Sequence, residues 1–593
     1  MAAVPRSAEP APARPPDALS GTGTTSVSFT LNGDPVDVGD GVSLLDALRE
    51  ELGCRSLKDG CSPQGQCGCC TVWVDGLPRV ACVTPVRRVA GRSVTTLEGL
   101  APDRRDRWAD AFVARGASQC GFCTPGIVMR LAALGDGGGG GAGGPSRRDI
   151  EAALRAHLCR CTGWQSIVEA ACDALDAGDP PPGGDAVPAA VTAAGRNALL
   201  ASWRAQTEGP AFQSSGPDVV LGDAGFADDT APPGASVQLG ADADRAPTVR
   251  AARAGQARIQ GRNSTVPLSH PVELPPGAWA LTLQTTWVEP AYVEPDASWC
   301  RPSGLPASPL ANGGAFGGKR RSPAPARARE LADESGRAVR VLWRREDVVR
   351  RGPKRPPLAI GLRPDGSGAV RLGRTPGSAE LGPLAARLRA LHPGLEVEEV
   401  EVTGPPVAPE LRGAGWAEVT AALCAVAAEP GPAGTGRARV ALPGAGSAEV
   451  ALRLDDDNVD DNGAGRGRGR LEVDVWAGAI LCPVTLRSYA LGAVHQALGM
   501  VWSEGIAVDG AGEPVDLTIR SFGILAARDM PDVVVRLHEE ERWPVNGSDA
   551  VFVATLAAAW IADGLPARWP TRRTAVRTPW RDVAPSGIRE ENP

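Results

Sequence analysis

QCGFCTPG at residues 119–126 and CRCTG at residues 159–163 are the two most informative stretches of this sequence. Between them, Ser146 and Asp149 form a capping-box pattern, and an apolar helical stripe then runs to the second stretch. We therefore expect a helical domain over residues 98–176, with cysteines at the ends of its helices. These cysteines are Cys120, Cys123, Cys159 and Cys161.

A second group of cysteines precedes them, in CSPQGQCGCC at residues 61–70. A [2Fe-2S] cluster takes four thiolates, and here a tight glycine-containing loop would give three and a neighbouring strand the fourth. The spacing Cys-x5-Cys-x2-Cys has a first gap that is one residue longer than the usual plant-type gap. The predicted ligands are Cys61, Cys67, Cys70 and Cys82, with Cys69 as a spare neighbour.

A structural zinc site and reduced structural thiols are the alternatives to an iron–sulfur site. A zinc site usually shows two CxxC knuckles and would here leave extra thiols, which favours iron–sulfur. Disulfides are disfavoured because the chain is long and its first residues lack the apolar region of a secretory signal.

The chain around this cysteine loop predicts a small β-grasp domain over residues 25–97. Residues 27–38 alternate apolar and polar side chains around an Asn-Gly turn, which predicts a β-hairpin. Ser43 can cap the helix that follows. A second hairpin is expected, with strands at residues 71–74 and 80–83.

With both cysteine groups in this order, residues 25–176 resemble the iron–sulfur part of the xanthine dehydrogenase and aldehyde oxidase family of molybdenum hydroxylases. The resemblance implies a distal [2Fe-2S] cluster in the β-grasp domain and a proximal one in the helical domain. It also implies a molybdopterin cofactor beside the proximal cluster. Gln119 matches the glutamine that touches the pterin in the family.

NGGAFGGK at residues 312–319 could be misread as a phosphate-binding P-loop. Arg320 stands where a P-loop needs Ser or Thr for Mg²⁺, so an NTPase is disfavoured. The segment instead resembles a glycine loop of the same family, in which the backbone approaches the molybdenum cofactor closely; a plain glycine-rich turn is the alternative. The resemblance implies cofactor-binding roles for Gly314, Ala315, Phe316 and Gly317.

Three further matches surround that loop in the family's order. AYVEP contains Glu294 and GPKRP contains Arg355, and the resemblance implies that both orient the substrate. Lys354 is the alternative to Arg355, and an ordinary surface carboxylate is the alternative for Glu294. LRGAG contains Arg412, which the resemblance places beside the cofactor.

The family's catalytic base is a glutamate in a Gly-x-Gly-Glu motif, and this sequence has NGSD at residues 546–549. The resemblance therefore makes Asp549 the candidate base, with a side chain one methylene shorter, and general-base catalysis depends on reach before pKa. The alternative is that Asp549 caps the apolar helix expected at residues 550–562.

The composition excludes several classes of protein. A formal net charge of -7 argues against a nucleic-acid-binding face. No apolar run reaches the roughly 18 residues that span a bilayer, so we expect a cytoplasmic protein. At roughly 100–200 residues per domain, 593 residues allow about four domains.

We expect an α+β multidomain chain. A disordered tail at residues 1–24 precedes the two iron–sulfur domains, and a Pro- and Gly-rich linker at residues 177–190 follows them. Two mixed α/β, molybdopterin-binding-like domains are then expected at residues 191–360 and 361–593.

The predicted function is an oxidoreductase that hydroxylates an aldehyde or N-heterocycle with water and passes electrons through both clusters to an external acceptor. No stretch offers a flavin domain, so we expect no FAD here and a separate flavoprotein subunit or another acceptor. The alternative is a [2Fe-2S] electron-transfer subunit with a degenerate, non-catalytic molybdopterin-type domain. It is favoured by the replacement of the family's glutamate by Asp549 and by the lack of a counterpart to the family's pterin-contacting glycine-glutamine-glycine segment. It is opposed by the surviving order of Glu294, the glycine loop, Arg355 and Arg412.

Overall fold

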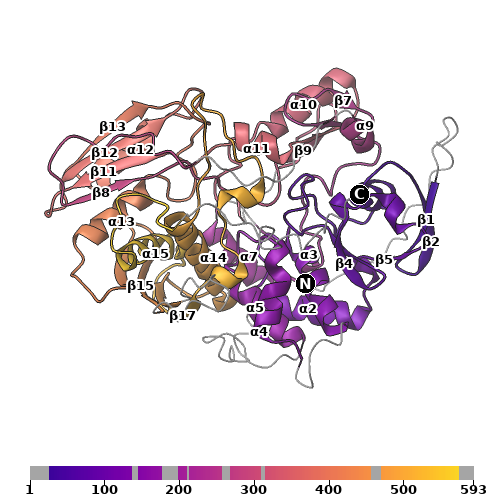
Figure 1. Cartoon of the computed structure of the whole chain (residues 1–593), viewed down its shortest axis with the longest axis horizontal. Helices are drawn as coiled ribbons and strands as arrows, with labels where there is room; N and C mark the ends of the chain where they lie inside the picture. The colour runs from indigo at the N-terminus through magenta and orange to yellow at the C-terminus, as the bar shows by residue number, and fades with distance from the viewer. Residues whose placement is uncertain are drawn as a thin grey trace, which may run out of the picture.

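The computed structural model describes residues 26–136, 144–175, 198–209, 213–254, 256, 267–308, 314–455 and 469–572. The predicted tail, the linker and residues 312–313 of the glycine loop lie outside the described residues. In Figure 1 the indigo β-grasp part and the sheet containing β11 and β12 lie at opposite sides of the molecule, with α14 and α15 between them.

The first sheet is the predicted β-grasp sheet, with strand order β2-β1-β5-β3-β4. Its first hairpin turns at Asn32 and Gly33, both with positive φ, as the Asn-Gly pair predicts. The Ser43 cap is also confirmed, because its side chain accepts from the Asp46 N–H at 3.1 Å. The strands are β1 (Ser26–Leu31), β2 (Asp34–Gly39), β3 (Thr71–Val74), β4 (Leu77–Val80) and β5 (Ser93–Thr95).

The strand predicted at residues 80–83 is wrong for most of its length. β4 ends at Val80, and the chain continues as the 3-10 helix η2 (Ala81–Val83). This turn brings Cys82 back toward the cysteine loop, where its N–H donates to Cys70 Sγ at 3.4 Å. The other short helices of this part are α1 (Leu44–Asp46), the π-helix η1 (Ala47–Glu51), η3 (Val86–Val89) and η4 (Leu97–Gly99).

The helical part follows as predicted. The Asp149 N–H donates to Ser146 Oγ at 3.3 Å and the Ser146 N–H to Asp149 Oδ2 at 2.9 Å, which confirms the capping box. One helix begins directly after Cys123, so this cysteine lies at a helix end as expected. The helices are α2 (Pro102–Arg115), α3 (Thr124–Asp136), α4 (Arg147–Ala153), η5 (Leu154–Ala156) and α5 (Gln165–Ala174).

The remaining described chain contains three four-stranded sheets, with strand orders β7-β6-β10-β9, β13-β12-β11-β8 and β14-β15-β16-β17. The second contains β6 (Ser236–Leu239), β7 (Arg245–Ala246), β9 (Ala297–Cys300) and β10 (Val339–Leu342). The third contains β8 (Leu281–Gln284), β11 (Leu358–Leu362), β12 (Gly368–Arg374) and β13 (Leu395–Glu401). The fourth contains β14 (Thr435–Ala441), β15 (Ser447–Leu454), β16 (Gly469–Trp476) and β17 (Asp532–His538). The domain boundary predicted at residue 360 falls inside β11. The third sheet therefore contains strands from both sides of that boundary.

Two long buried helices, α14 (Pro483–Trp502) and α15 (Ser548–Ala562), form the centre of the C-terminal part. No helix in the described ranges is both long and apolar enough to cross a membrane. The remaining helices are α7 (Ala198–Glu208), α8 (Pro217–Val220), α9 (Val249–Ala254), α10 (Ala324–Ser335), α11 (Arg345–Arg351), α12 (Gly382–Leu391), α13 (Trp416–Val426), η6 (Ile519–Phe522) and η7 (Ala527–Asp529).

The CRCTG loop of the helical part lies directly against α14. A Cβ on Gly163 would come 2.3 Å from Leu491 O, and a Cβ on Gly492 would come 1.8 Å from Cys161 O. Both contacts are far too short for any side chain, so the two backbones meet only because both positions are glycine.

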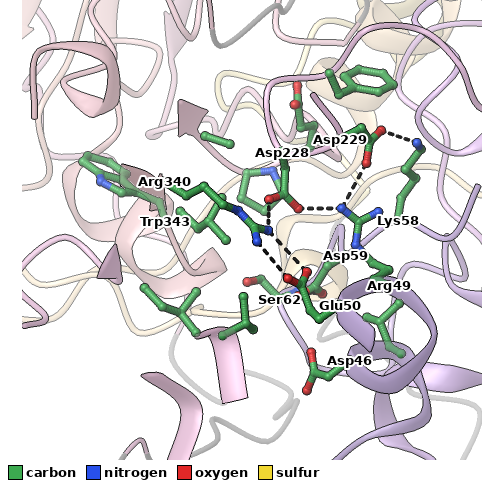
Figure 2. A pocket seen from close by; sticks show the side chains of 18 of the residues that line it. Asp46, Arg49, Glu50, Lys58, Asp59, Ser62, Asp228, Asp229, Arg340 and Trp343 are labelled. Carbon is green, nitrogen blue, oxygen red and sulfur yellow. Dashed lines mark hydrogen bonds and ion pairs between the residues drawn. The ribbon is translucent and has the colours of Figure 1, made fainter. Parts of the chain in front are cut away.

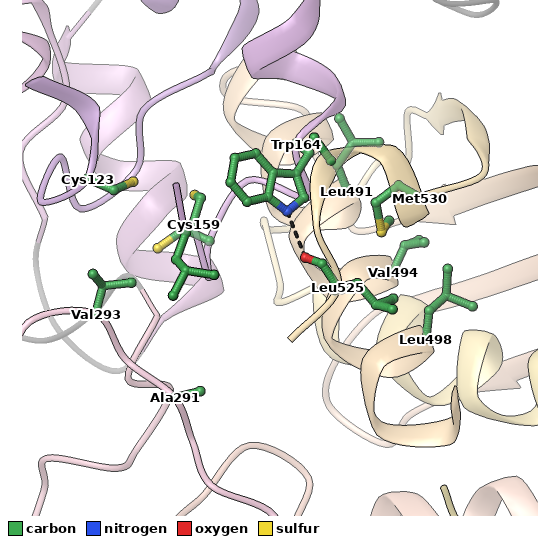
Figure 3. Packing of buried hydrophobic residues seen from close by; sticks show 14 of the residues in the cluster. Cys123, Cys159, Trp164, Ala291, Val293, Leu491, Val494, Leu498, Leu525 and Met530 are labelled. Carbon is green, nitrogen blue, oxygen red and sulfur yellow. Dashed lines mark hydrogen bonds between the residues drawn. The ribbon is translucent and has the colours of Figure 1, made fainter. Parts of the chain in front are cut away.

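Trp164 completes this contact. Its indole N–H donates to Leu525 O at 3.0 Å, and the side chain is 1% exposed. Burial of so large an aromatic surface stabilises the contact between the two parts. Figure 3 shows the Trp164 indole nitrogen facing Leu525, and the same hydrophobic cluster includes Leu491, Val494, Leu498 and Met530.

A network of ion pairs joins the β-grasp part to the second sheet, around a cavity of about 590 Å³. Arg340 on β10 donates to Glu50 at 2.8 Å and also pairs with Asp228. Arg49 donates to Asp228 at 2.6 Å and to Asp229 at 2.9 Å (Figure 2). The two arginine side chains are 7% and 4% exposed, so each depends on its carboxylates for charge compensation.

Replacing Arg340 with methionine should therefore leave Glu50 partly buried without its nearest cation, and Asp228 with Arg49 as its remaining partner. Because these carboxylates are about a fifth exposed and can regain some water, we expect the free energy of unfolding to fall by about 1–3 kcal/mol. The thermal unfolding midpoint, measured by calorimetry, should fall with it. Arg437→Met is the control: it removes an arginine that is 75% exposed and should change stability by less than about 0.5 kcal/mol. Equal midpoints for the two variants would contradict the network's role.

Candidate functional site

The predicted distal ligands lie together around the loop at residues 61–70. The Cys67 and Cys82 thiols hydrogen-bond to the Cys61 sulfur and hold the pKa of Cys61 well below its usual value. Correspondingly, the pKa values of Cys67 and Cys82 are raised. The backbone N–H groups of Gln64 and Gln66 donate to Cys61 Sγ at 3.2 and 3.4 Å. Thiolates ringed by such donors fit an iron–sulfur cluster.

The predicted proximal ligands form a matching set. The Cys120 and Cys161 sulfurs are 3.7 Å apart. The Cys123 and Cys161 thiols hydrogen-bond to Cys159 and lower its pKa well below the usual value, and Thr162 Oγ1 lies 3.3 Å from the Cys159 sulfur. None of the cysteines in the described chain forms a disulfide. Among the described residues, no group of three or more His, Cys, Asp or Glu side chains is arranged to hold one metal ion, whereas each iron of a [2Fe-2S] cluster takes two cysteines.

The two cysteine loops touch through their backbones. A Cβ on Gly126, in α3, would come 2.4 Å from Gly68 O and 2.8 Å from the Cα of Cys69. Cys69 is buried between the sets, and its thiol donates to Cys67 O at 3.8 Å. The glycines at both positions therefore let the distal and proximal sets lie close together.

The glycine loop lies against the proximal set. Gly314 has φ +81°, and a Cβ there would come 3.3 Å from Cys161 Sγ and 3.2 Å from the Cβ of Arg160. Gly317 has φ +97°, and a Cβ there would come 1.9 Å from Glu410 O. The Arg412 N–H donates to Phe316 O at 2.9 Å. The structure thus brings the predicted glycine loop, with Ala315, and Arg412 together beside the proximal set.

A cavity of about 400 Å³ opens on the other side of this loop. Arg355 lines it and donates from Nη2 to Glu418 at 3.0 Å and from Nη1 to Arg412 O. The Arg355 guanidinium lies 5.5 Å from the centre of the Phe552 ring. The other residues that line the cavity include Arg160, Glu289, Gly314, Ala315, Phe316, Arg412, Gln496 and Glu504.

Asp549 lies in the first turn of α15, behind Arg412. Its Oδ1 accepts from Arg412 Nε at 2.8 Å, while Arg412 Nη2 donates to Ser548 Oγ at 2.6 Å. Asp549 does not cap the helix, because α15 begins at Ser548 and the Asp549 N–H donates to Asn546 Oδ1 at 2.9 Å. The alternative role as a cap is therefore wrong, and Arg412 links Asp549 to the cavity wall.

Glu294 is not among the residues that line this cavity. Its carboxylate accepts from Lys319 Nζ at 2.7 Å and lines the separate cavity drawn in Figure 2. Burial raises the pKa of Glu294 to about 7, although the positive charge of Lys319 opposes the shift. The structure thus separates Glu294 from Arg355, with which it was expected to act.

The cavity contains Glu289 instead, a residue that the sequence reasoning missed. Glu289 is 1% exposed, and its Oε1 has no hydrogen-bond partner within the described ranges. Its Oε2 lies 3.0 Å from Lys354 Nζ, and burial raises the pKa of Glu289 while it lowers that of Lys354. The signal was present in the sequence, because VEP occurs twice, at residues 288–290 and 293–295.

Gln119 lines a third cavity, of about 450 Å³. The polar atoms that face this cavity show whether a pterin fits there. Its amide donates to Cys161 O at 2.9 Å and Ser488 Oγ at 3.1 Å, but its Oε1 is buried without a partner among the described residues. Gln213 Nε2, which lines the same cavity, is likewise unpartnered in that part of the chain. A buried spare acceptor and donor beside the proximal set fit a flat polar heterocycle such as a pterin.

The comparisons with known proteins agree with this geometry. Residues 24–98 match the family described as "2Fe-2S iron-sulfur cluster binding domain", and residues 96–172 the family described as "[2Fe-2S] binding domain". A protein of Bacillus subtilis, named as a probable subunit of xanthine dehydrogenase, is 39% identical over 146 residues, which cover 24% of this chain and 82% of that protein. The aldehyde oxidoreductase of Megalodesulfovibrio gigas is 42% identical over 135 residues, but the match covers only 14% of that protein.

The fold likeness extends much further along the chain than the sequence likeness. The solved structure of the aldehyde oxidoreductase from Desulfovibrio gigas superposes with a TM-score of 0.63 at 15% identity, over 92% of this chain and 99% of that one. At this identity the likeness concerns the fold alone. The family is shown by the iron–sulfur part, and the chain belongs to the xanthine dehydrogenase and aldehyde oxidase family of molybdenum hydroxylases.

Proposed function

We propose that this chain is a molybdenum hydroxylase that oxidises an aldehyde or an N-heterocycle with water. The observation that carries the proposal is the position of Gly314, which lies against the Cys161 sulfur of the proximal set and also lines the cavity with Arg355 and Arg412. A redox centre and a polar cavity with a single glycine between them suit a reaction whose electrons leave directly through the cluster.

Residues on both sides of this wall would hold the cofactor. Gln119 would bind the pterin through its spare Oε1, and the backbone of Gly314 to Gly317 would approach the metal end. When bound, molybdopterin supplies a metal that accepts the electron pair from the substrate.

The cavity side chains would orient the substrate. Arg355 and Arg412 place two guanidinium groups at the wall, and Arg412 Nη1 is buried with no partner among the described residues. A substrate oxygen or ring nitrogen could accept from it. Glu289 offers a carboxylate to a substrate N–H, and the Phe316 and Phe552 rings exclude water from the apolar side.

Asp549 is the proposed general base. Its carboxylate must reach the proton that it accepts, and the ion pair with Arg412 sets its direction. The Asp549 side chain is one methylene shorter than the family's glutamate. Whether its carboxylate reaches the proton that it must accept therefore depends on where Arg412 holds it.

Electrons would leave through the distal cluster to a partner. Val83, next to the ligand Cys82, is 49% exposed, so the distal set lies one residue from the surface. The relative from Bacillus subtilis is named as a subunit, which supports a separate acceptor subunit, such as a flavoprotein.

A second candidate function, electron transfer with a non-catalytic C-terminal part, is favoured by the state of the carboxylates around the cavity. Asp549, Glu418 and Glu504 are all held in ion pairs with arginines. The arginines thus occupy carboxylate oxygens that a base would have to offer to a substrate proton.

Metal and pterin analysis of the purified chain separates the two candidates. We expect four Fe per chain, because each set of four cysteines suits a two-iron cluster, together with one Mo and one pterin. Four Fe without Mo or pterin would overturn the hydroxylase and leave the electron-transfer candidate.

Ligand variants test the assignment of the cysteines. Cys70→Ser and Cys161→Ser should each lower the iron content from four to two per chain, and EPR of the reduced protein should lose one of its two signals. Cys69→Ser is the matched control, because Cys69 is equally buried and next to a ligand yet is proposed to bind no iron. Loss of iron in Cys69→Ser would show that the ligand set is wrong.

Asp549→Asn tests the base. Turnover of benzaldehyde, xanthine or nicotinate, whichever the wild type oxidises with dichlorophenolindophenol, should fall by about 100-fold or more because the proton acceptor is lost. Both clusters should still be bleached by dithionite. Asp549→Glu should retain turnover, and Asp365→Asn, in the exposed turn between β11 and β12, should match the wild type. Full turnover in Asp549→Asn would remove this residue from the mechanism.

A further inference from the structure

Arg160 lies between two proposed ligands, Cys159 and Cys161, but its side chain leaves the cluster loop and enters the cavity. Its two terminal nitrogens pair with both oxygens of Glu504, one of them at 2.6 Å, and its Nε donates to Pro290 O at 3.1 Å. The side chains of Arg160 and Glu504 are 7% and 2% exposed. This is a buried bidentate pair, the geometry in which an arginine is held most firmly.

The backbone of Arg160 is equally fixed. Its carbonyl oxygen accepts from Gln496 Nε2 at 3.2 Å, and its Cβ lies 3.2 Å from the position that a Cβ on Gly314 would take. The partners of Arg160 therefore lie on the cavity wall or on α14, and hydrogen bonds from all three of its side-chain nitrogens hold the guanidinium. A full positive charge is thus held at a set distance from the proximal sulfurs.

Glu504 belongs to this arrangement and not to the proposed catalytic steps. It lies just beyond the end of α14, and its N–H donates to Gly499 O at 2.7 Å. Burial raises the pKa of Glu504, while the charges of Arg160 and then Arg355 oppose the shift. The carboxylate faces Arg160 directly, so it offsets part of the charge that the proximal sulfurs experience.

We propose that Arg160 is a positioning residue that raises the reduction potential of the proximal cluster, and that Glu504 holds it in place and partly offsets its charge. Reduction adds one electron and no atom to a [2Fe-2S] cluster. A fixed positive charge in a low-dielectric interior stabilises the added negative charge, and a carboxylate behind it weakens this effect. The proposal rests on the proposed cluster ligands and not on hydroxylase activity.

Midpoint potentials of the two clusters, measured by EPR-monitored redox titration of the full chain, test it without any substrate. Glu504→Gln removes the offsetting charge and keeps one of the two acceptors for Arg160, the amide oxygen, so the proximal potential should rise. Arg160→Met removes the positive charge, so the potential should fall. Arg160→Lys keeps the charge and should restore much of the wild-type value.

If the Arg160–Glu504 pair had only a structural role, replacing one residue or the other would not shift the proximal potential in opposite directions. The distal cluster in the same sample is the internal control, and its potential should change much less. Glu418→Gln is the matched variant, because Glu418 forms a buried pair with Arg355, which belongs to no cluster loop. Its effect on the proximal potential should be smaller than that of Glu504→Gln.

Shifts of the same sign in Glu504→Gln and Arg160→Met, or shifts of equal size at both clusters, would overturn the proposal. So would an effect of Glu418→Gln as large as that of Glu504→Gln. If Glu504→Gln fails to retain four Fe, Glu504→Asp performs the same test: it withdraws the carboxylate by one methylene and should give a smaller rise. Failure here with Mo and pterin present would leave the hydroxylase proposal intact.

Discussion

The backbone contact between the CRCTG loop and α14 is the constraint on which the rest of the structure depends. Gly163 meets Leu491 O and Gly492 meets Cys161 O at distances that admit no side chain. This contact fixes the proximal cysteines against the C-terminal part, and Trp164 then buries its indole in the same region. The glycine loop, Arg160 and the cavity all take their positions from this shared surface.

Paired charges are the second organising feature. The arginines of the cavity wall pair with carboxylates of other segments. Arg355 with Glu418 joins the chain before β11 to α13, and Arg412 with Asp549 joins the loop before α13 to α15. Buried pairs of this kind contribute little net stability, but breaking one leaves a charge without compensation. They therefore specify one arrangement of the segments around the cavity more than they strengthen it.

The parts that could be predicted from sequence are those that local chemistry determines. The cysteine spacings, the Asn-Gly hairpin and the Ser146 cap depend on neighbouring residues, and each is found where it was expected. The position of Glu294 could not be predicted, because Lys319 lies 25 residues away and draws its carboxylate toward a different cavity. Glu289 was missed for the same reason: its significance comes from burial beside Lys354, which no local pattern reports. The end of β4 at Val80 likewise follows from the tertiary need to return Cys82 to its loop.

Gly314 contacts the proximal cysteines and also lines the cavity, so its lack of a side chain matters on both sides. Under the proposed function, electrons would pass from the cavity to the proximal cluster beside this one residue, which has no side chain to lengthen the path. A larger residue at position 314 would lengthen the path between the cavity and the cluster, and its side chain would press on Cys161 Sγ. Under the proposed function, different substrates would therefore be accommodated by changes on the Glu289 or Phe552 side of the cavity, while Gly314 would stay glycine to keep the cavity close to the cluster.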